Sequence, residues 1–291
     1  MYIIASIIFI VFLIVIFLHI NHYRIYYLNL KKLFPGKYRY DEVGKYYDNW
    51  TDKFIKSGYK NVIQAHRSEN IEETLDYIIK SAGINDGMHI LDAGCGVCGP
   101  AIYFAAKKNI TVDCVTNSKV QKEIAEKEIE KNNLSHRVKV HHMDYHQLEK
   151  LFAEKSFDLV YFLESYGHAT DQTRLLKGVH RVLKLGGSIY IKDYFAAETY
   201  DNNYKNLRMA LGIKNMNKVY RYNMADLYHT IYTLRHLQMQ LIKIQRPSFG
   251  WDNDKTLMDF EIANGINLFE GKEVVSIVSP LELLFTKEST G

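Results

Sequence analysis

Short apolar segments alternate with longer amphipathic segments through most of this chain. The apolar segments predict β-strands at residues 88–92, 110–115, 137–142, 157–163 and 188–193, and closing strands near 239–244 and 281–287. The segments between the first five have helical spacing; from Ser118 to Asn132, for example, Val120, Ile124 and Ile129 fall roughly on one face. Strands and helices that alternate in this way predict a parallel sheet, and hence an α/β fold.

The segments on either side of this core have a different pattern. Residues 38–82 predict helices that lead into the core, with Asn70 as an N-cap and Glu73 placed to complete a capping box. Residues 195–235 are rich in Tyr, Asn and Met and have a mostly helical pattern. An insertion here would lie over the carboxyl ends of the strands, where open α/β sheets bind ligands. We interpret it as a substrate lid, and the alternative is an ordinary helical connection.

The run from Tyr2 to Ile20 is apolar almost throughout and contains no Lys, Arg, Asp or Glu. At about 1.5 Å per residue it just spans the hydrocarbon of a bilayer, which predicts a single-pass transmembrane anchor. A cleaved signal peptide is the alternative, but the run is long for one, lacks a basic start and precedes no A-x-A site. Basic residues follow it at Arg24, Lys31, Lys32, Lys37 and Arg39. By the positive-inside rule the catalytic part is expected in the cytosol, at the endoplasmic reticulum if the source is eukaryotic.

These patterns divide the 291 residues into five segments. They are a transmembrane anchor (1–22), a juxtamembrane and N-terminal helical segment (23–83), an α/β core (84–194), a helical lid (195–237) and closing strands of the core (238–291).

The stretch ILDAGCGVCGPAIYFAA, residues 90–106, predicts a strand, a glycine turn and a helix. Its glycines match the G-x-G-x-x-G pattern of dinucleotide binding, which alone is a weak signal. The second strand ends at Thr116 without the acid that binds the ribose in dinucleotide enzymes. Asp92, two residues before Gly94, instead resembles the loop that binds S-adenosylmethionine (SAM) in Rossmann-like methyltransferases. We favour SAM over a dinucleotide or a purely structural turn.

Composition narrows the class of partner and of site. The net charge of +4 is small and no stripe of Lys and Arg interleaved with aromatic residues is present, so the sequence predicts no nucleic-acid partner. Three cysteines are too few for a disulfide framework. Cys95 and Cys98 have C-x-x-C spacing, but no second Cys/His pair is spaced to complete a zinc site, so no metal is predicted.

Five motifs carry a family resemblance that spans about residues 46–203. They are YYDNWTDKF (46–54), LDAGCGVCGPA (91–101), ESYGHA (164–169), HRVLKLGG (180–187) and TYDNN (199–203). They resemble, in the same order, motifs of the sterol side-chain (sterol 24-C) methyltransferases, which are class I SAM-dependent enzymes. The run through Gly-Pro-Ala in the second motif is more specific than a general SAM loop.

The resemblance implies a Rossmann-like methyltransferase fold, a parallel sheet with one antiparallel closing strand, and SAM as the cofactor. It implies SAM contacts at Asp92, Gly94, Gly96, Asn117 and Gln121, and at Asp144 for the adenine. Asn117 and Gln121 stand where that family has Asn and Gln, which explains the absence of the usual ribose acid. An uncharged amide still hydrogen-bonds ribose hydroxyls, though more weakly than a carboxylate.

Two segments depart from the family pattern, IKSGYKNVIQAH (55–66) and LGIKNMNKVY (211–220). In the family these segments border the substrate. The resemblance implies a hydrophobic acceptor, which is a sterol or another isoprenoid lipid. Because these two segments differ, a terpenoid or prenyl diphosphate, or another small molecule, stays open as an alternative acceptor.

Methyl transfer to an alkene generates a carbocation, which aromatic faces and a fixed negative charge stabilise. Glu164, at the end of the fourth strand, is the predicted charge, and His168 is predicted to assist or to accept the proton that is finally lost. Asp193 is a third catalytic candidate. Each has a structural alternative, such as a strand-end ion pair for Glu164. Aromatic residues predicted to line the acceptor pocket, unless they are core residues, are Tyr46, Tyr47, Trp50 and Tyr166.

Two rival functions share most of these features. A cyclopropane-forming lipid enzyme uses the same cation chemistry, but its product has lost a double bond. A membrane-bound SAM-binding protein without catalysis would keep the glycine loop alone. The leading hypothesis remains a membrane-anchored carbon methyltransferase.

Overall fold

The computed structural model describes residues 9–13, 38–56, 61–68, 70–197, 203–248 and 278–288. Met1–Pro35 and Gly36–Gly291 form two separate compact units. In the first unit residues 9–13 are helical, with exposed apolar side chains such as Phe9 and Phe12. In the ranges that the structure describes, no helix has the length and apolar character needed to cross a bilayer. Most of the predicted anchor lies outside those ranges.

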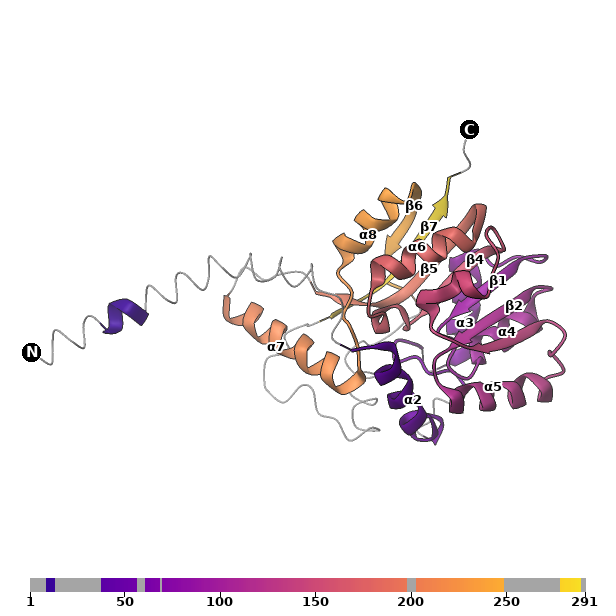
Figure 1. Ribbon diagram of the computed structural model, residues 1–291, viewed down its shortest axis with the longest axis horizontal. Helices are drawn as coiled ribbons and strands as arrows, with labels where there is room; N and C mark the ends of the chain where they lie inside the picture. Colours follow the sequence, from indigo (N-terminus) through magenta and orange to yellow (C-terminus); the bar gives the residue numbers. More distant parts are fainter. Residues whose placement is uncertain are drawn as a thin grey trace, which may run out of the picture. The chain divides into compact units, whose positions relative to one another are not determined.

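A seven-stranded sheet forms the centre of the second unit, with strand order β3-β2-β1-β4-β5-β7-β6 (Figure 1). The strands are β1 (His89–Ala93), β2 (Thr111–Thr116), β3 (Val138–His142), β4 (Phe157–Leu163), β5 (Leu183–Ala196), β6 (Met239–Gln245) and β7 (Val278–Lys287). Strands β1 to β5 pair in parallel, and β7 is antiparallel to both β5 and β6. This confirms the predicted mostly parallel sheet with one antiparallel closing strand.

Strand β5 differs most from its prediction, which was residues 188–193. It starts earlier because Leu183 pairs with Phe157, after which the register shifts and Ser188 pairs with Leu159. Gly186, with φ +76°, allows this irregularity. The strand also ends later because Ala196 still pairs with β7.

The helices are α2 (Tyr40–Phe54), α3 (Ile71–Ala82), α4 (Gly99–Lys107), α5 (Lys119–Lys131), α6 (Gln172–Val182), α7 (Asn203–Tyr220) and α8 (Leu227–His236), with the short 3₁₀ helices η2 (Tyr145–Lys150) and η3 (Tyr166–His168). Asn70 caps α3 as predicted, but its side chain accepts from the Glu72 N–H rather than from that of Glu73. Ser118 caps α5 by accepting from the Gln121 N–H.

Helices cover both faces of the sheet, because successive strand residues point to opposite sides. Ile90 packs into a cluster with α3, α4 and α5, whereas its neighbour Leu91 packs into a cluster with η2, α6 and α8. Burial on both faces explains why the central strands β1 and β4 have nearly continuous apolar sequences.

A third apolar cluster joins α2 and α7 to the ends of β5 and β7. Its buried members include Tyr46 and Phe54 from α2, Met216 from α7 and Tyr194 from β5. In Figure 1, α2 and α7 lie on the same side of the sheet, below it in this view. The predicted helical character of residues 195–235 is confirmed for α7 and α8, and their role as a lid stays a prediction.

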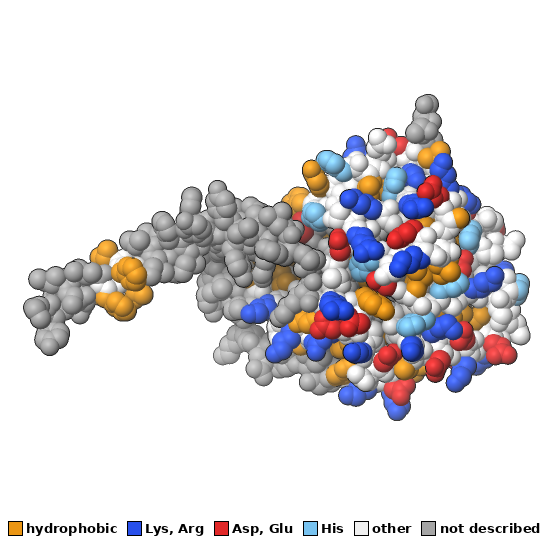
Figure 2. All heavy atoms as spheres, viewed as in Figure 1, with side chains coloured by type: hydrophobic (Ala, Val, Ile, Leu, Met, Phe, Trp, Pro, Cys, Tyr) orange, Lys and Arg blue, Asp and Glu red, His pale blue; other side chains and the backbone are white. Residues whose placement is uncertain are grey.

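Charged side chains of both signs are interspersed over the described surface that Figure 2 shows. This agrees with the net charge of +4 for the whole chain. On this face neither sign forms an extended patch of the kind that nucleic-acid-binding surfaces have.

Candidate active site

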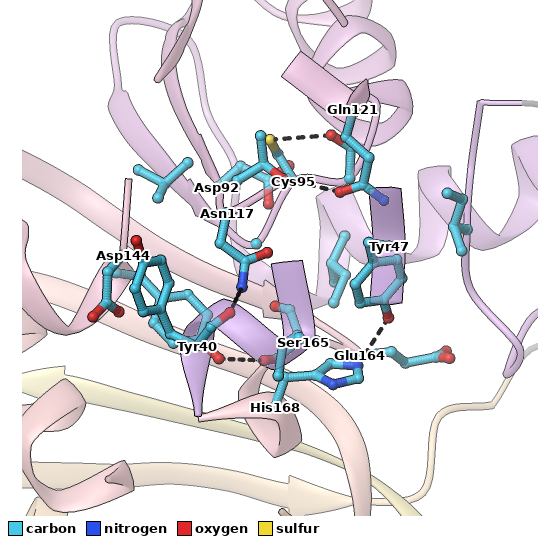
Figure 3. A pocket seen from close by; sticks show the side chains of 18 of the residues that line it. Tyr40, Tyr47, Asp92, Cys95, Asn117, Gln121, Asp144, Glu164, Ser165 and His168 are labelled. Carbon is cyan, nitrogen blue, oxygen red and sulfur yellow. Dashed lines mark hydrogen bonds between the residues drawn. The ribbon is translucent and has the colours of Figure 1, made fainter. Parts of the chain in front are cut away.

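One cavity lies at the carboxyl ends of β1, β2, β3 and β4, where parallel sheets bind ligands (Figure 3). The loops after these strands line it on one side, and the helix α2 lines it with Tyr40, Val43 and Tyr47. Its empty volume is about 800 Å³, open space at the mouth included.

The glycine turn after β1 is shaped by a close approach of two loops. Gly94 has φ +103°, a conformation that side chains disfavour. A Cβ atom added to Gly94 would lie 2.4 Å from the Cβ of Ser165, in the loop after β4. The Ser165 hydroxyl donates to the Ala93 carbonyl over 2.6 Å. Glycine is therefore required where these two loops meet at the cavity.

Asp92 places a buried carboxyl at the end of β1, with the residue only 2% exposed. The Tyr161 hydroxyl donates to it over 2.9 Å. Burial raises the pKa of Asp92 well above its usual value, and the Tyr161 hydrogen bond offsets only part of this. A positively charged group of a ligand beside Asp92 would stabilise its ionised form and so offset the free energy that burial adds to its ionisation.

Asn117, after β2, and Gln121, on α5, also line the cavity, and their contacts with the ribose stay a prediction. The Asn117 amide donates to the Tyr40 carbonyl of α2 over 3.0 Å, and the Gln121 side-chain oxygen accepts from the Thr116 hydroxyl over 2.9 Å. Gly44 lets α2 come this close, because a Cβ at Gly44 would lie 2.6 Å from the Asn117 carbonyl oxygen. Asn117, which the sequence placed at the ribose, thus also holds α2 over the cavity.

Asp144 follows β3 and caps η2, where its side chain accepts from the His146 N–H over 2.9 Å and contacts His146 Nδ1 at 2.5 Å. Burial alone would raise the pKa of Asp144, but the interactions with His146 outweigh it and the pKa lies below its usual value. Asp144 therefore presents an ionised carboxylate to the cavity, as an acceptor suited to an amino group.

Tyr47 and His168 form a hydrogen-bonded pair at the cavity wall (Figure 3). His168 Nδ1 lies 3.2 Å from the Arg221 carbonyl, which can only accept, so Nδ1 carries the proton. Nε2 therefore accepts from the Tyr47 hydroxyl, 2.9 Å away. Burial lowers the pKa of His168 to about 4 and raises that of Tyr47 well above its usual value. Both side chains are neutral at neutral pH.

Glu164 lines the cavity but is held on all sides. Its carboxylate accepts from the N–H groups of Ala65 and His66 over 2.7 and 2.9 Å, and forms a 2.7 Å ion pair with buried Lys192. The prediction gave Glu164 a free negative charge that faces a cation. In the structure a cation and two backbone donors already offset that charge, so Glu164 fastens residues 61–68 to the sheet.

Four predicted site residues do not line this cavity: Asp193, Tyr46, Trp50 and Tyr166. Asp193 is 2% exposed and accepts from the Gly167 and Tyr194 N–H groups and from the Tyr222 hydroxyl. Burial raises its pKa to about 6. Tyr166 is fully buried and shares a hydrogen bond with Thr230 of α8.

Tyr46 and Trp50 instead stack on each other along α2, with ring centroids 5.9 Å apart. They pack with the third apolar cluster, behind Tyr47. The period of a helix explains this for Tyr46, since only one of two successive residues can face the cavity. Trp50 lies one turn further along α2, where it stacks on Tyr46.

Tyr40, Tyr145 and Ser165 are among the lining residues that sequence reasoning did not identify. Tyr145 and Ser165 lie within three residues of the ends of β3 and β4, so the rule that ligands bind at carboxyl ends was an available signal for them. Tyr40 has no such signal, because its position depends on how α2 packs.

The chemistry of the cavity fits SAM. A buried carboxyl at Asp92 suits the cationic part of the molecule, and amides at Asn117 and Gln121 suit the ribose hydroxyls. The Asp144 carboxylate suits the adenine amino group, and the turn at Gly94 lets the ligand approach the backbone closely.

Comparison with known proteins agrees with this geometry. A family model described as a methyltransferase domain matches residues 91–191. The sterol 24-C-methyltransferase erg6 of Aspergillus fumigatus is 35% identical over 150 residues, which are 49% of this chain and 39% of that protein. The match therefore spans about two fifths of that curated relative.

Solved structures share the fold at low identity. The crystal structure of the cyclase SpnF has a TM-score of 0.70 and 18% identity, and covers 88% of this chain and 98% of that chain. Geranyl diphosphate C-methyltransferase from Streptomyces coelicolor has a TM-score of 0.58 and 13% identity, with 74% and 79% covered. Such distant likeness establishes the fold alone. Residues 91–191 match a methyltransferase domain, and the chain resembles the sterol 24-C-methyltransferases over about half of its length.

Proposed function

We propose that this protein transfers the methyl group of SAM to a carbon of an alkene in a sterol or another isoprenoid lipid. The observation that carries the proposal is the neutral Tyr47–His168 pair at the cavity wall. Such a pair can take up a proton, which alkene methylation must release. The similarity to a sterol 24-C-methyltransferase adds support.

The residues that would hold SAM are Asp92, Gly94, Asn117, Gln121 and Asp144, together with Gly96, all of which line the cavity. When bound, SAM supplies an electrophilic methyl group on a sulfonium. The chain's part is to orient the acceptor against it, and holding two reactants in place contributes much of the rate enhancement.

An aromatic wall suits the carbocation that an alkene forms when it gains a methyl group. Tyr40, Tyr47 and Tyr145 line the cavity, and the faces of such rings attract cations. Glu164 contributes less to this than the sequence suggested, because Lys192 already offsets its charge.

The proton leaves the cation through the hydrogen bond between Tyr47 and His168. Tyr47 Oη accepts the proton from the acceptor's carbon while its own proton passes to His168 Nε2, 2.9 Å away. A pKa of about 4 makes His168 a weak base. That suffices here, because a C–H bond beside a carbocation is strongly acidic.

The test is to incubate the detergent-solubilised full chain with methyl-labelled SAM and a panel of sterols, terpene diphosphates and unsaturated phospholipids. We expect the label on a carbon atom of a sterol or neutral isoprenoid, and we expect the product to retain an alkene. The variant His168→Asn serves as the control and should lose turnover. A labelled diphosphate, or a product without its double bond, would exclude the proposed reaction. SAM binding without transfer to any acceptor would indicate a non-catalytic protein.

We further propose that Tyr2 to Ile20 anchors the chain in a membrane with the catalytic unit in the cytosol. Support comes from the apolar run and from the basic residues that follow it. Flotation with vesicles should carry the full chain and leave a chain without residues 1–22 behind, and equal flotation of the two would exclude the anchor.

A further inference from the structure

All three cysteines of the chain lie together, although only two of them are close in sequence. Cys95 and Cys98 belong to the loop between β1 and α4, and Cys114 lies on β2. The pairing of β1 with β2 places Cys114 opposite Asp92, directly before the glycine turn. The three Sγ atoms lie within 4.8 Å of one another, and all three residues are buried.

This spacing is close to that of ligands around one metal ion. With metal–thiolate bonds of about 2.3 Å, three sulfur ligands in a trigonal site lie about 4.0 Å from one another. The Sγ atoms thus need to approach one another by at most about 0.8 Å. The sequence predicted no metal because C-x-x-C offers two ligands, and the sheet supplies the third.

We propose that Cys95, Cys98 and Cys114 bind one soft metal ion, and that Cu(I) is the best fit. Thiolates select soft ions, and Cu(I) is stable with three sulfur ligands, whereas structural zinc takes four. Among the described residues, no His, Asp or Glu joins the three cysteines within ligand distance. Metal binding here involves no redox step: thiol protons pass to solvent as the sulfurs coordinate.

The site has an entry route and lies next to the methyl-donor loop. Cys95 lines the cavity, while Cys98 and Cys114 are fully buried behind it. An ion therefore reaches the three sulfurs from the cavity, past the turn that carries Gly94 and Gly96.

The test is a titration of the reduced, full-length protein with Cu(I) without oxygen, in competition with a chromogenic Cu(I) chelator. We expect one ion per chain with thiolate-to-metal charge-transfer absorption. Because the chain has only three cysteines, that absorption reports this cluster alone. Less than half an equivalent bound, or binding without the absorption, would overturn the proposal.

Cys98→Gly is the decisive variant because it should not harm the fold. Cys98 has φ +64°, the left-handed conformation that glycine adopts most readily. Losing a residue that only hydrogen-bonds to a metal ligand commonly costs 10- to 100-fold in metal affinity, so we expect loss of a direct ligand to cost at least about 100-fold. Cys114→Ala should lose a similar share of its Cu(I) affinity.

Met143→Leu, which removes a sulfur from the cavity wall, is the matched control and should bind Cu(I) as the unmodified chain does. Unchanged affinity in Cys98→Gly would overturn the proposal.

Discussion

His168 owes its chemistry to two neighbours that lie far from it in sequence. The Arg221 carbonyl fixes its tautomer, and the Tyr47 hydroxyl occupies its free nitrogen. The residue types and the strand-end position of His168 were predictable from the sequence. Its partners were not, because they depend on how α2 and the loop after α7 pack.

Tyr47→Phe removes the hydroxyl through which the proton passes. We expect kcat to fall by at least about 100-fold, the lower range for a general base, while SAM affinity stays within a few-fold. Single-turnover assays and calorimetry give the two values. Tyr103→Phe is the matched control, because the Tyr103 hydroxyl bonds Asp76 outside the cavity. A turnover equal to that of the control would remove Tyr47 from the mechanism.

The pH dependence of turnover follows from the pKa of His168, lowered by burial to about 4. A depressed pKa keeps the imidazole neutral, and able to accept a proton, as pH falls through its usual value of 6.5. We expect kcat to stay level down to about pH 5 and to be halved near pH 4. Asp193, with a pKa of about 6, lies outside the cavity lining. An acid limb near pH 6 would therefore point to Asp193 and contradict the assignment to His168.

Asp92→Asn keeps the shape of the side chain and removes its charge. A hydrogen bond to a charged group contributes about 1.5–3 kcal/mol, so we expect SAM to bind about 10- to 150-fold more weakly. Calorimetry on the full chain measures this. Asp113→Asn, on β2, is the matched control, since Asp113 bonds His89 and His141 and does not line the cavity. Equal affinities in both variants would show that Asp92 does not face the ligand.

At the scale of elements, the sequence predicted the sheet well because the central strands, such as β1, β4 and β5, are buried on both faces and have apolar sequences. It missed features that depend on contacts across elements. The ion pair of Glu164 with Lys192 joins residues on neighbouring strands, and the cysteine cluster needs β2 beside β1. Neither the ion pair nor the cysteine cluster produces a periodic pattern in the sequence.

Glu164→Gln should destabilise the fold, because it leaves the Lys192 ammonium, 1% exposed, without its carboxylate. Removing one partner of a buried pair typically costs about 3–5 kcal/mol. Chemical denaturation should show this loss, and the double variant Glu164→Gln/Lys192→Met should recover most of it. A single variant as stable as the unmodified chain would mean that the pair does not hold residues 61–68.

Helix α2 offers a test of how the cavity is closed. In Gly44→Ala the new methyl group would lie 2.6 Å from the Asn117 carbonyl oxygen, so α2 must move away and SAM affinity should fall several-fold or more. Gly178→Ala is the same change in α6, where the nearest atom is 3.8 Å away. It should leave SAM affinity unchanged and stabilise the protein by about 0.8–1 kcal/mol. An equal change of SAM affinity in the two variants would contradict a close contact at Gly44.

At the scale of the whole molecule, two separate sets of residues meet at the carboxyl edge of the sheet. The loops after β1, β2 and β3 carry the groups that suit the donor, and α2 with the loop after β4 carries the Tyr47–His168 pair. The resemblance named the first set, whose members all line the cavity, and their contacts with SAM stay a prediction. The second set was partly misassigned, because Tyr46, Trp50 and Tyr166 pack into the interior instead.

Most of the predicted anchor and the motif at residues 199–202 lie outside the described residues. The proposals on membrane attachment therefore depend on the flotation experiment and not on the fold. The catalytic proposal is independent of them, because its residues all belong to Gly36–Gly291.

A crystal structure of the full chain with S-adenosylhomocysteine, the demethylated donor, tests the central claim most directly. The account predicts the ligand in the cavity, with its adenine beside Asp144, its ribose beside Asn117 and Gln121, and its amino group toward Asp92. A cavity that stays empty at saturating ligand, or a ligand bound elsewhere on the chain, would contradict it.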